Sequence, residues 1–260
     1  MEHPDFLHRD LLGKRVHRMG ITTSYGLDVK GVEEAFERGV NYLMWTPARR
    51  RLRRLVREVV ARDRDRYVLA TGPVLGYFPG SLRRTVEVAL RESRSEYLDI
   101  LQMFWAGVMS SLSASMMSEM VRLRDEGKVR AIGVAIHDRK RAARLAAAGP
   151  LDFFMLRYNA AHPGAEVDIF PHLPEPRPLI TAYTATSWGK LLKPPSSWAG
   201  PAATAGDCYR FCLKSPYVDV VLSAPKTVAQ LRENLAALER GPLSDEEQSR
   251  MRALGRAVHG

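Results

Sequence analysis

Residues 39–46, GVNYLMWT, form a short apolar run rich in β-forming side chains, and they directly follow a helical pattern over residues 31–38. The same alternation of strand and helix patterns continues along the chain, and strands separated by helices are typical of a parallel sheet built from βαβ units. Eight such units in 260 residues predict closure into a (β/α)8 TIM barrel rather than an open doubly wound sheet. The expected strands lie at 15–22, 41–45, 67–71, 98–103, 129–135, 153–157, 179–183 and 218–223.

Helical patterns fill the stretches between these strands, and one more follows the last strand. This final helix is expected to begin at Ser244, where Glu247 completes a capping box, and to pack outside the barrel. No linker divides the chain, so we expect a single domain over residues 1–260. No GxGxxG stretch opens a helix, which argues against a dinucleotide-binding Rossmann fold. The expected barrel helices lie at 31–38, 50–62, 82–93, 118–126, 139–147, 165–170, 205–214 and 228–238.

The composition indicates a globular protein without a membrane span. Apolar residues make up 45% of the chain, but no run approaches the roughly 18 apolar residues that a spanning helix needs. The first residues lack the features of a secretory signal, so we expect a cytoplasmic protein. The two cysteines, Cys208 and Cys212, lie four apart on an expected helix. This spacing suits neither a disulfide nor a metal site, and we expect no bound metal.

The chain is basic, with 39 Lys and Arg against 29 Asp and Glu and a net charge of +10. Such a surplus attracts phosphates, acidic metabolites, nucleic acid or anionic membranes alike. Part of it lies in residues 49–57, where arginines alternate with Leu and Val at helical spacing, so we interpret most of these arginines as a solvated helix face. No nucleic-acid-binding motif accompanies the charge, and the expected partner is a small molecule.

Several motifs give the barrel a family resemblance. Residues 39–46 are similar to the GINFIDTA signature of aldo-keto reductases, and residues 126–134, EGKVRAIGV, are similar to that family's EGKVRxIGV. The same family carries Tyr-Asn on its sixth strand, Ala-Tyr-Ser on its seventh and QLxENL on its last barrel helix. These motifs resemble Tyr158-Asn159, Ala182-Tyr183-Thr184 and residues 230–235. The order of the motifs implies the family's barrel fold, and residues 158–166 resemble a divergent bacterial branch.

The resemblance also implies which residues should carry the chemistry, and here the chain departs from the family. Aldo-keto reductases pass hydride from NADPH to a carbonyl while a tyrosine, tuned by a lysine and an aspartate and assisted by a histidine, donates the proton. The corresponding positions are Met44 for aspartate, Arg49 for tyrosine, Gly72 for lysine and Phe104 for histidine. Met, Gly and Phe cannot transfer protons, and arginine is never deprotonated in proteins. The positions that hold the nicotinamide carboxamide in the family read Ala135, Ile136 and Met155.

Other cofactor positions are retained. By the resemblance, Tyr183 would stack on the nicotinamide ring, and the positions that bind the 2′-phosphate and adenine read Lys226, Gln230, Glu233 and Asn234. Lys226 stands at a strand-to-helix turn, which is a suitable place to meet a phosphate. The alternative is that Glu233 and Asn234 only cap and brace the last barrel helix. NADP(H) binding and simple bracing are both open at this point.

A barrel builds its site on the loops after its strands, and those loops here are aromatic and cationic. His137 follows the fifth strand and is the best general acid or base, Arg49 could hold an oxyanion, and Tyr183 completes the catalytic set. The alternatives without a catalytic role are that His137 is an ordinary surface histidine and that Arg49 only begins its helix. An aromatic pocket favours a bulky, aromatic or polyene-like substrate. The expected pocket residues are Trp45, Tyr77, Phe78, Phe104, Trp105, Arg157, Asn159, Trp188 and Lys190.

Three functions of different classes follow from this pattern. The first is an atypical NADP(H)-linked oxidoreductase with relocated proton donors. The second is a redox-neutral isomerase, dehydratase or cyclase acting on a bulky hydrophobic metabolite. The third is a barrel that binds a partner without catalysis.

Overall fold

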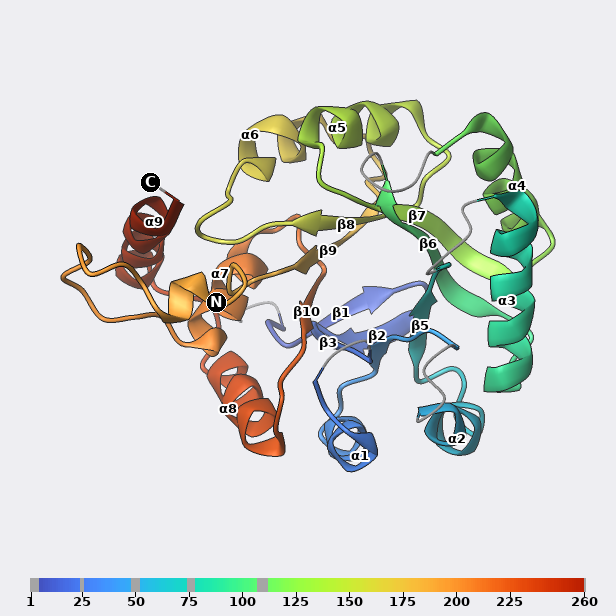
Figure 1. The fold of residues 1–260 in the computed structure, drawn as a ribbon, viewed down its shortest axis with the longest axis horizontal. Helices are drawn as coiled ribbons and strands as arrows, with labels where there is room; N and C mark the ends of the chain where they lie inside the picture. Colours follow the sequence, from blue (N-terminus) through green and yellow to red (C-terminus); the bar gives the residue numbers. More distant parts are fainter. Residues whose placement is uncertain (1–4, 24–25, 48–51, 74–77, 107–111, 260) are drawn as a thin grey trace.

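Eight parallel strands close into a barrel in the computed structural model, which describes residues 5–23, 26–47, 52–73, 78–106 and 112–259. The strands follow one another around the barrel in chain order, with β10 closing on β3, and helices surround them (Figure 1). The predicted (β/α)8 barrel is therefore confirmed. The barrel strands are β3 (Met19–Thr22), β4 (Tyr42–Met44), β5 (Val68–Thr71), β6 (Leu98–Ala106), β7 (Val129–Ile136), β8 (Phe153–Arg157), β9 (Leu179–Tyr183) and β10 (Val220–Ser223).

The helices begin where side chains can cap them. Asp28, Ser113, Asp138, Thr204 and Thr227 each accept a hydrogen bond from a backbone N–H in the first turn of the helix that follows. Of the region expected as one helix over 50–62, residues 50 and 51 lie outside the described structure, and Arg53–Val60 is a short α-turn continued by a π-helical turn. The barrel helices are α1 (Val29–Glu37), α2 (Arg53–Leu55) with η2 (Val56–Val60), α3 (Pro79–Ser93), α4 (Ala114–Asp125), α5 (Arg139–Ala148), α6 (Ala165–Asp168) with η3 (Phe170–His172), α7 (Ala205–Lys214) and α8 (Val228–Glu239).

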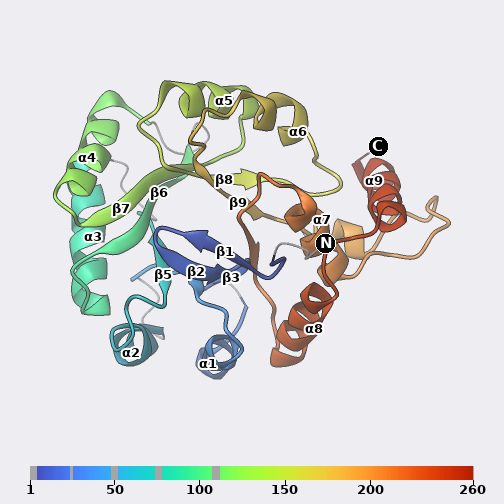
Figure 2. The same cartoon turned by 180° about the vertical axis from the view of Figure 1, so that it is seen from behind.

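The stretch expected as a single first strand, 15–22, is two strands broken at Arg18. Its first half, β2 (Lys14–His17), pairs antiparallel with β1 (His8–Leu11) in a hairpin that lies across the barrel (Figure 2). Val16 and His17 are both buried, so the strand alternation ends there, and the apolar pattern on either side concealed this break. Leu11 and Val16 join the cluster inside the barrel and close one end of it.

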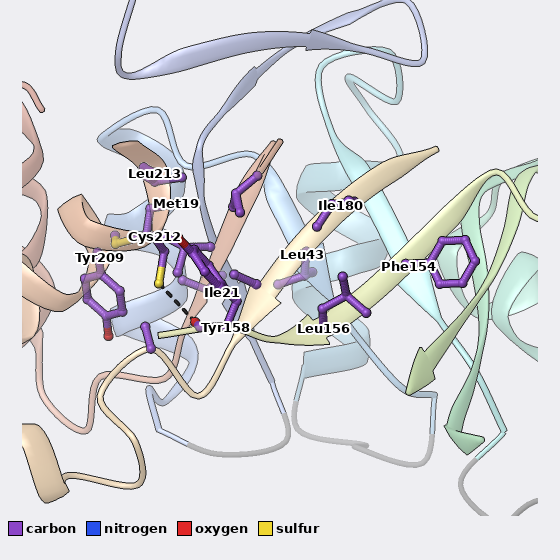
Figure 3. Packing of buried hydrophobic residues seen from close by; sticks show 14 of the residues in the cluster. Met19, Ile21, Leu43, Phe154, Leu156, Tyr158, Ile180, Tyr209, Cys212 and Leu213 are labelled. Atoms are coloured by element: carbon purple, nitrogen blue, oxygen red, sulfur yellow. Dashed lines mark hydrogen bonds between the residues drawn. The ribbon is translucent and has the colours of Figure 1, made fainter. Parts of the chain in front are cut away.

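Side chains of the barrel strands alternate between two apolar layers. Inward residues such as Tyr42, Ala70 and Phe153 fill the barrel, while outward residues such as Leu43 and Leu156 pack against the helices. Figure 3 shows part of the outer layer, where Met19, Ile21, Leu43, Phe154, Leu156 and Ile180 lie on the sheet and Tyr209, Cys212 and Leu213 belong to α7.

Three aspartates near the N-terminal ends of alternate strands, here called the basal aspartates, each join two neighbouring strands. Each carboxylate accepts a hydrogen bond from a backbone N–H of the preceding strand and pairs with an arginine. These three carboxylates and the three backbone N–H groups are thereby paired without involving the opposite end of the barrel. The sets are Asp99 with Leu69 N (2.8 Å) and Arg64 (2.5 Å), Asp152 with Ile132 N (3.1 Å) and Arg124 (2.8 Å), and Asp219 with Ile180 N (2.7 Å) and Arg177 (2.7 Å).

The expected C-terminal helix is α9 (Asp245–His259), and it packs outside the barrel against α7. Its capping box forms as the sequence predicted, because Ser244 N donates to Glu247 at 2.8 Å and Glu247 N donates to Ser244 Oγ at 3.1 Å. Gly255 lies so close to the loop after β8 that a Cβ there would be 2.0 Å from the Ala160 carbonyl oxygen. Within the described residues, no helix has the length and apolar character to cross a membrane.

Candidate active site at the barrel mouth

A histidine and a tyrosine meet at the C-terminal end of the barrel. His137 directly follows β7, and Tyr183 is the last residue of β9, with β8 between the two strands. The Tyr183 hydroxyl lies 2.9 Å from Nε2 and 3.1 Å from Nδ1 of His137, and the two rings meet edge to face. The structure thus brings together two of the three residues expected to be catalytic.

Burial fixes the protonation states of this pair at neutral pH. Burial lowers the pKa of His137 below its usual value, and the positive charge of Arg157 lowers it further, so the imidazole is neutral. Burial raises the pKa of Tyr183 to about 12, although Arg157 opposes the rise, so the phenol keeps its proton. One O–H and one N–H are therefore shared between the two side chains, and the tautomer of His137 decides which group donates.

Arg157 stands next to this pair at the end of β8, where it is paired in register with Tyr183. Its side chain is half-buried, yet within the described part of the chain its guanidinium makes no hydrogen bond or ion pair. A half-buried arginine with five unused donors is an unusual arrangement, because burial normally comes with pairing. Arg157 is available to a ligand.

Asn159, another expected pocket residue, is fully buried and its amide is engaged by the protein. Its Nδ2 donates to the Thr184 carbonyl at 2.8 Å, and its Oδ1 accepts from Ala161 N at 3.0 Å. The same oxygen lies 3.1 Å from Nδ1 of His162. Asn159 therefore ties the loop after β8 to the loop after β9 and leaves no amide atom for a ligand.

The remaining expected pocket residues lie in different places. Phe104 faces the barrel interior and is 8% exposed, whereas Trp188 is 77% exposed and Lys190 is also exposed, both in the loop after β9. Trp45 is not at the mouth: it is fully buried in the outer layer, because strand alternation turns Met44 inward and Trp45 towards the helices. Arg49, Tyr77 and the side chain of Trp105 lie outside the described part of the structure.

The loop after β9 is held in an uncommon backbone conformation. Thr184, Ser187 and Trp188 have φ values of 54°, 51° and 58°, which are left-handed and unfavourable for residues with a Cβ. Backbone hydrogen bonds from Ser187 to Thr184 (2.8 Å) and from Lys190 to Ser187 (3.1 Å) hold the turn. Strain of this kind, of order 1–3 kcal/mol per residue, is concentrated at functional sites.

His162 is a residue of the site that the sequence reasoning did not single out. It lies in the loop after β8, and its ring centroid is 4.6 Å from that of His259 on α9. Burial, together with the positive charges of Arg157, His259, Lys190 and Arg139, lowers the pKa of His162 to about 4. Its place three residues after Asn159, in the stretch 158–166, was the available signal.

Comparison with known proteins identifies the scaffold. A model of the Aldo/keto reductase family matches residues 29–192, which is more than half of the chain. The chain belongs to the aldo-keto reductase family. None of the curated proteins compared with it matches.

Solved structures of aldo-keto reductases share the fold at low sequence identity. The holo form of aldo-keto reductase AKR11C1 from Bacillus halodurans is 18% identical, with 96% of each chain covered and a TM-score of 0.77. Glycerol dehydrogenase AKR11B4 from Gluconobacter oxydans is 17% identical, with 99% of this chain and 98% of that chain covered and a TM-score of 0.76. A putative 2,5-diketo-D-gluconic acid reductase B is 20% identical, with a TM-score of 0.69 over 93% of this chain and 89% of the other.

Gly72, which the family resemblance assigns to the lysine position, has no room for a side chain. A Cβ at Gly72 would lie 2.0 Å from the carbonyl oxygen of Gln102 and 3.0 Å from the ring of Phe104. With this backbone, neither a lysine nor an alanine fits between β5 and β6.

The four positions that the family resemblance assigns to the 2′-phosphate and adenine differ in how accessible they are to a ligand. Lys226 is exposed beside the N-terminus of α8, where a phosphate is favoured, and Glu233 is also exposed. Gln230 is engaged by its own turn, because its Oε1 accepts from Lys226 N at 2.8 Å. Asn234 is 5% exposed, and its amide nitrogen lies 3.5 Å from Ser223 Oγ. Lys226 and Glu233 are thus accessible to a ligand, whereas Gln230 and Asn234 contact their own turn and Ser223. NADP(H) binding and simple bracing by Glu233 and Asn234 both stay predictions.

No cluster of three or more His, Cys, Asp or Glu residues suited to a metal occurs among the described residues.

Proposed function

We propose that this aldo-keto reductase family member is an atypical NADP(H)-linked oxidoreductase of carbonyl compounds in which His137 and Tyr183 carry the proton transfer. The hydrogen bond between these two side chains, 2.9 Å from Tyr183 Oη to His137 Nε2, is the observation that supports it most directly. A neutral imidazole hydrogen-bonded to a protonated phenol at the mouth of a barrel can act as a general acid and base.

The pair can pass a proton without leaving a full charge on the imidazole. As the oxygen of a substrate gains negative charge, a neutral His137 can give it the N–H proton while Tyr183 passes its own proton to the other ring nitrogen. The tyrosinate that results lies near the positive charge of Arg157, which lowers the pKa of Tyr183 against the effect of burial. NADP(H), when bound, supplies the hydride that reduces the carbonyl carbon.

The usual tetrad of the family does not serve in this proposal. By the family resemblance, its positions are occupied by Met44, Arg49, Gly72 and Phe104. The lack of space for a Cβ at Gly72 supports the proposal that no lysine acts at this position. Proton transfer would then have moved around the barrel, from the strands β4 to β6 to the strands β7 to β9. Arg49 remains a proposed oxyanion-holding residue of the same site.

A bulky, aromatic or polyene-like substrate remains part of this proposal. Trp188 and Phe78, which are 77% and 59% exposed, stand on loops that follow β9 and β5 and would contact such a substrate at the rim. We also propose a cytoplasmic protein, in keeping with its two free cysteines.

A redox-neutral enzyme is the second candidate, and the inner wall of the barrel supports it. Ala135 and Met155 are buried in the interior cluster at positions that would grip a nicotinamide carboxamide in the family. Neither side chain offers a hydrogen bond to an amide, and Gln230 is occupied by its own turn. The same His137–Tyr183 pair would then serve an isomerase, dehydratase or cyclase.

The first experiment measures NADPH binding by fluorescence or calorimetry, then oxidation of NADPH with a panel of aldehydes and ketones. His137→Ala and Tyr183→Phe should each lower kcat/KM by about 10²–10⁴. His172→Ala and Tyr217→Phe, which remove the same groups away from the mouth, should leave it unchanged.

Absence of NADPH binding at millimolar cofactor would refute the oxidoreductase. Turnover without nicotinamide that His137→Ala abolishes would establish the second candidate. Capture of a partner, with no turnover on any compound tested, would instead indicate the non-catalytic barrel.

A further inference from the structure

Arg157 is a half-buried cation for which the described residues supply no anion. Arg139 differs in this respect, since it pairs with Asp168 at 2.5 Å. Holding a guanidinium partly out of water without a partner costs free energy, and such groups are normally paired. A ligand that brings an anionic group to the mouth would supply the missing partner.

His162 lies five residues after Arg157, in the loop that follows β8, and its tautomer follows from its contact with Asn159. Asn159 Nδ2 donates to the Thr184 carbonyl and Asn159 Oδ1 accepts from Ala161 N, so the amide cannot be reversed. The nitrogen of His162 that faces this oxygen, Nδ1, must therefore donate. Nε2 is left as the atom that gains a proton when His162 becomes charged.

The positive potential around His162 comes from several elements. Arg157 ends β8, Lys190 stands in the loop after β9, and Arg139 and His259 begin α5 and end α9. Asn159 links the loop of His162 to Thr184, at the start of the turn that carries Lys190. The largest electrostatic influences on His162 all come from these four basic residues. Of these basic residues, Arg139 has a counter-ion in Asp168, whereas Arg157 and Lys190 have no ion-pair partner among the described residues.

We propose that Arg157, His162 and Lys190 form an oxyanion subsite that takes a carboxylate or phosphate group of the substrate. This inference rests on the proposed function, because it assumes that the substrate reacts beside His137 and Tyr183. Arg157 donates to the oxyanion, Lys190 adds charge at the rim, and His162 takes up a proton on Nε2 as the anion arrives. The substrate is then an acid or a phosphate ester whose reacting carbonyl lies next to its charged group.

The test follows the Cε1 proton of His162 by NMR in the full-length protein, assigned with His162→Gln. The pKa of His162 is measured in chloride, acetate, phosphate and pyrophosphate at one ionic strength. Acetate and phosphate should raise it by about one unit or more, because an opposite charge within about 4–6 Å favours the charged imidazole. The rise should disappear in Arg157→Gln and persist in Arg256→Gln, which removes an exposed arginine of α9.

An unchanged pKa in all four salts would overturn the proposal, and so would a full shift in Arg157→Gln. A shift with pyrophosphate alone would assign the subsite to a dinucleotide and overturn the substrate class. Should Arg157→Gln fail to fold, Lys190→Gln, at an exposed position, must reduce the shift. None of these readings needs NADPH or turnover, so failure of the proposed function leaves them interpretable.

Discussion

Replacing the basal aspartate Asp219 should destabilise the barrel, and it should do so more than replacing the basal aspartate Asp152. Its side chain is 3% exposed, and it accepts from Ile180 N at 2.7 Å and from both terminal nitrogens of Arg177 at 2.9 and 2.7 Å. Asp219→Ala removes all three bonds. Asp219→Asn keeps an acceptor for Ile180 N but loses the charge.

The magnitude follows from what each variant leaves unpaired. An orphaned buried N–H costs about 1–3 kcal/mol, and removing one member of a buried ion pair costs about 3–5 kcal/mol. The Arg177 side chain is 20% exposed and can recover some hydration, so these effects are not additive. We expect losses of about 4 kcal/mol for Asp219→Ala and about 2 kcal/mol for Asp219→Asn. Asp152 is 39% exposed, and Asp152→Ala should cost about 1–2 kcal/mol.

Urea unfolding followed by circular dichroism measures these differences. With a slope of about 3 kcal/mol per molar urea, Asp219→Ala should lower the midpoint by more than about 1 M. Asp245→Asn, a change at a 98% exposed side chain, should leave the midpoint where it is. A loss below about 1 kcal/mol in Asp219→Ala, or a larger loss at Asp152 than at Asp219, would refute the reasoning.

Three further outcomes are expected. Gly255→Ala should loosen α9, because a Cβ would meet backbone 2.0 Å away; limited proteolysis of the C-terminal helix would detect this, and equal protection in the variant would contradict it. The proposed activity needs neutral His137 and protonated Tyr183, so kcat/KM should fall only below the lowered pKa of the histidine and above about pH 12. A kcat/KM profile that is not flat at pH 7–9 would count against the pair. Burial raises the pKa of Cys208 to about 12 and that of Cys212 above its usual value. Neither thiol should therefore react with a disulfide reagent at pH 8 until urea unfolds the chain, and rapid labelling of the native protein would disprove this.

Most of the barrel could be predicted from local sequence because each βα unit repeats the same pattern. The exceptions have specific physical causes. The break at Arg18 lies between two stretches that both satisfy a strand pattern, and only the hairpin pairing with β1 separates them. The region 50–62 has helical periodicity, which does not distinguish an α-turn from the π-turn that continues it at Val56–Val60.

The site was predictable only where a residue acts through its position on a strand. His137, Arg157 and Tyr183 could be placed at the mouth because they end or follow strands, and parallel strands end on one side. Trp45 follows a strand too, but one step of alternation turns it outward. His162 depends on a loop folded by the Asn159 amide, and no period in the sequence describes such a loop.

The position of the basal aspartates has a consequence for how this protein can change. All three fasten the strands at the end of the barrel that faces away from His137 and Tyr183. The loops at the mouth can therefore exchange residues without loosening any of these fastenings. A lineage built in this way can discard one reaction and acquire another while the same barrel persists.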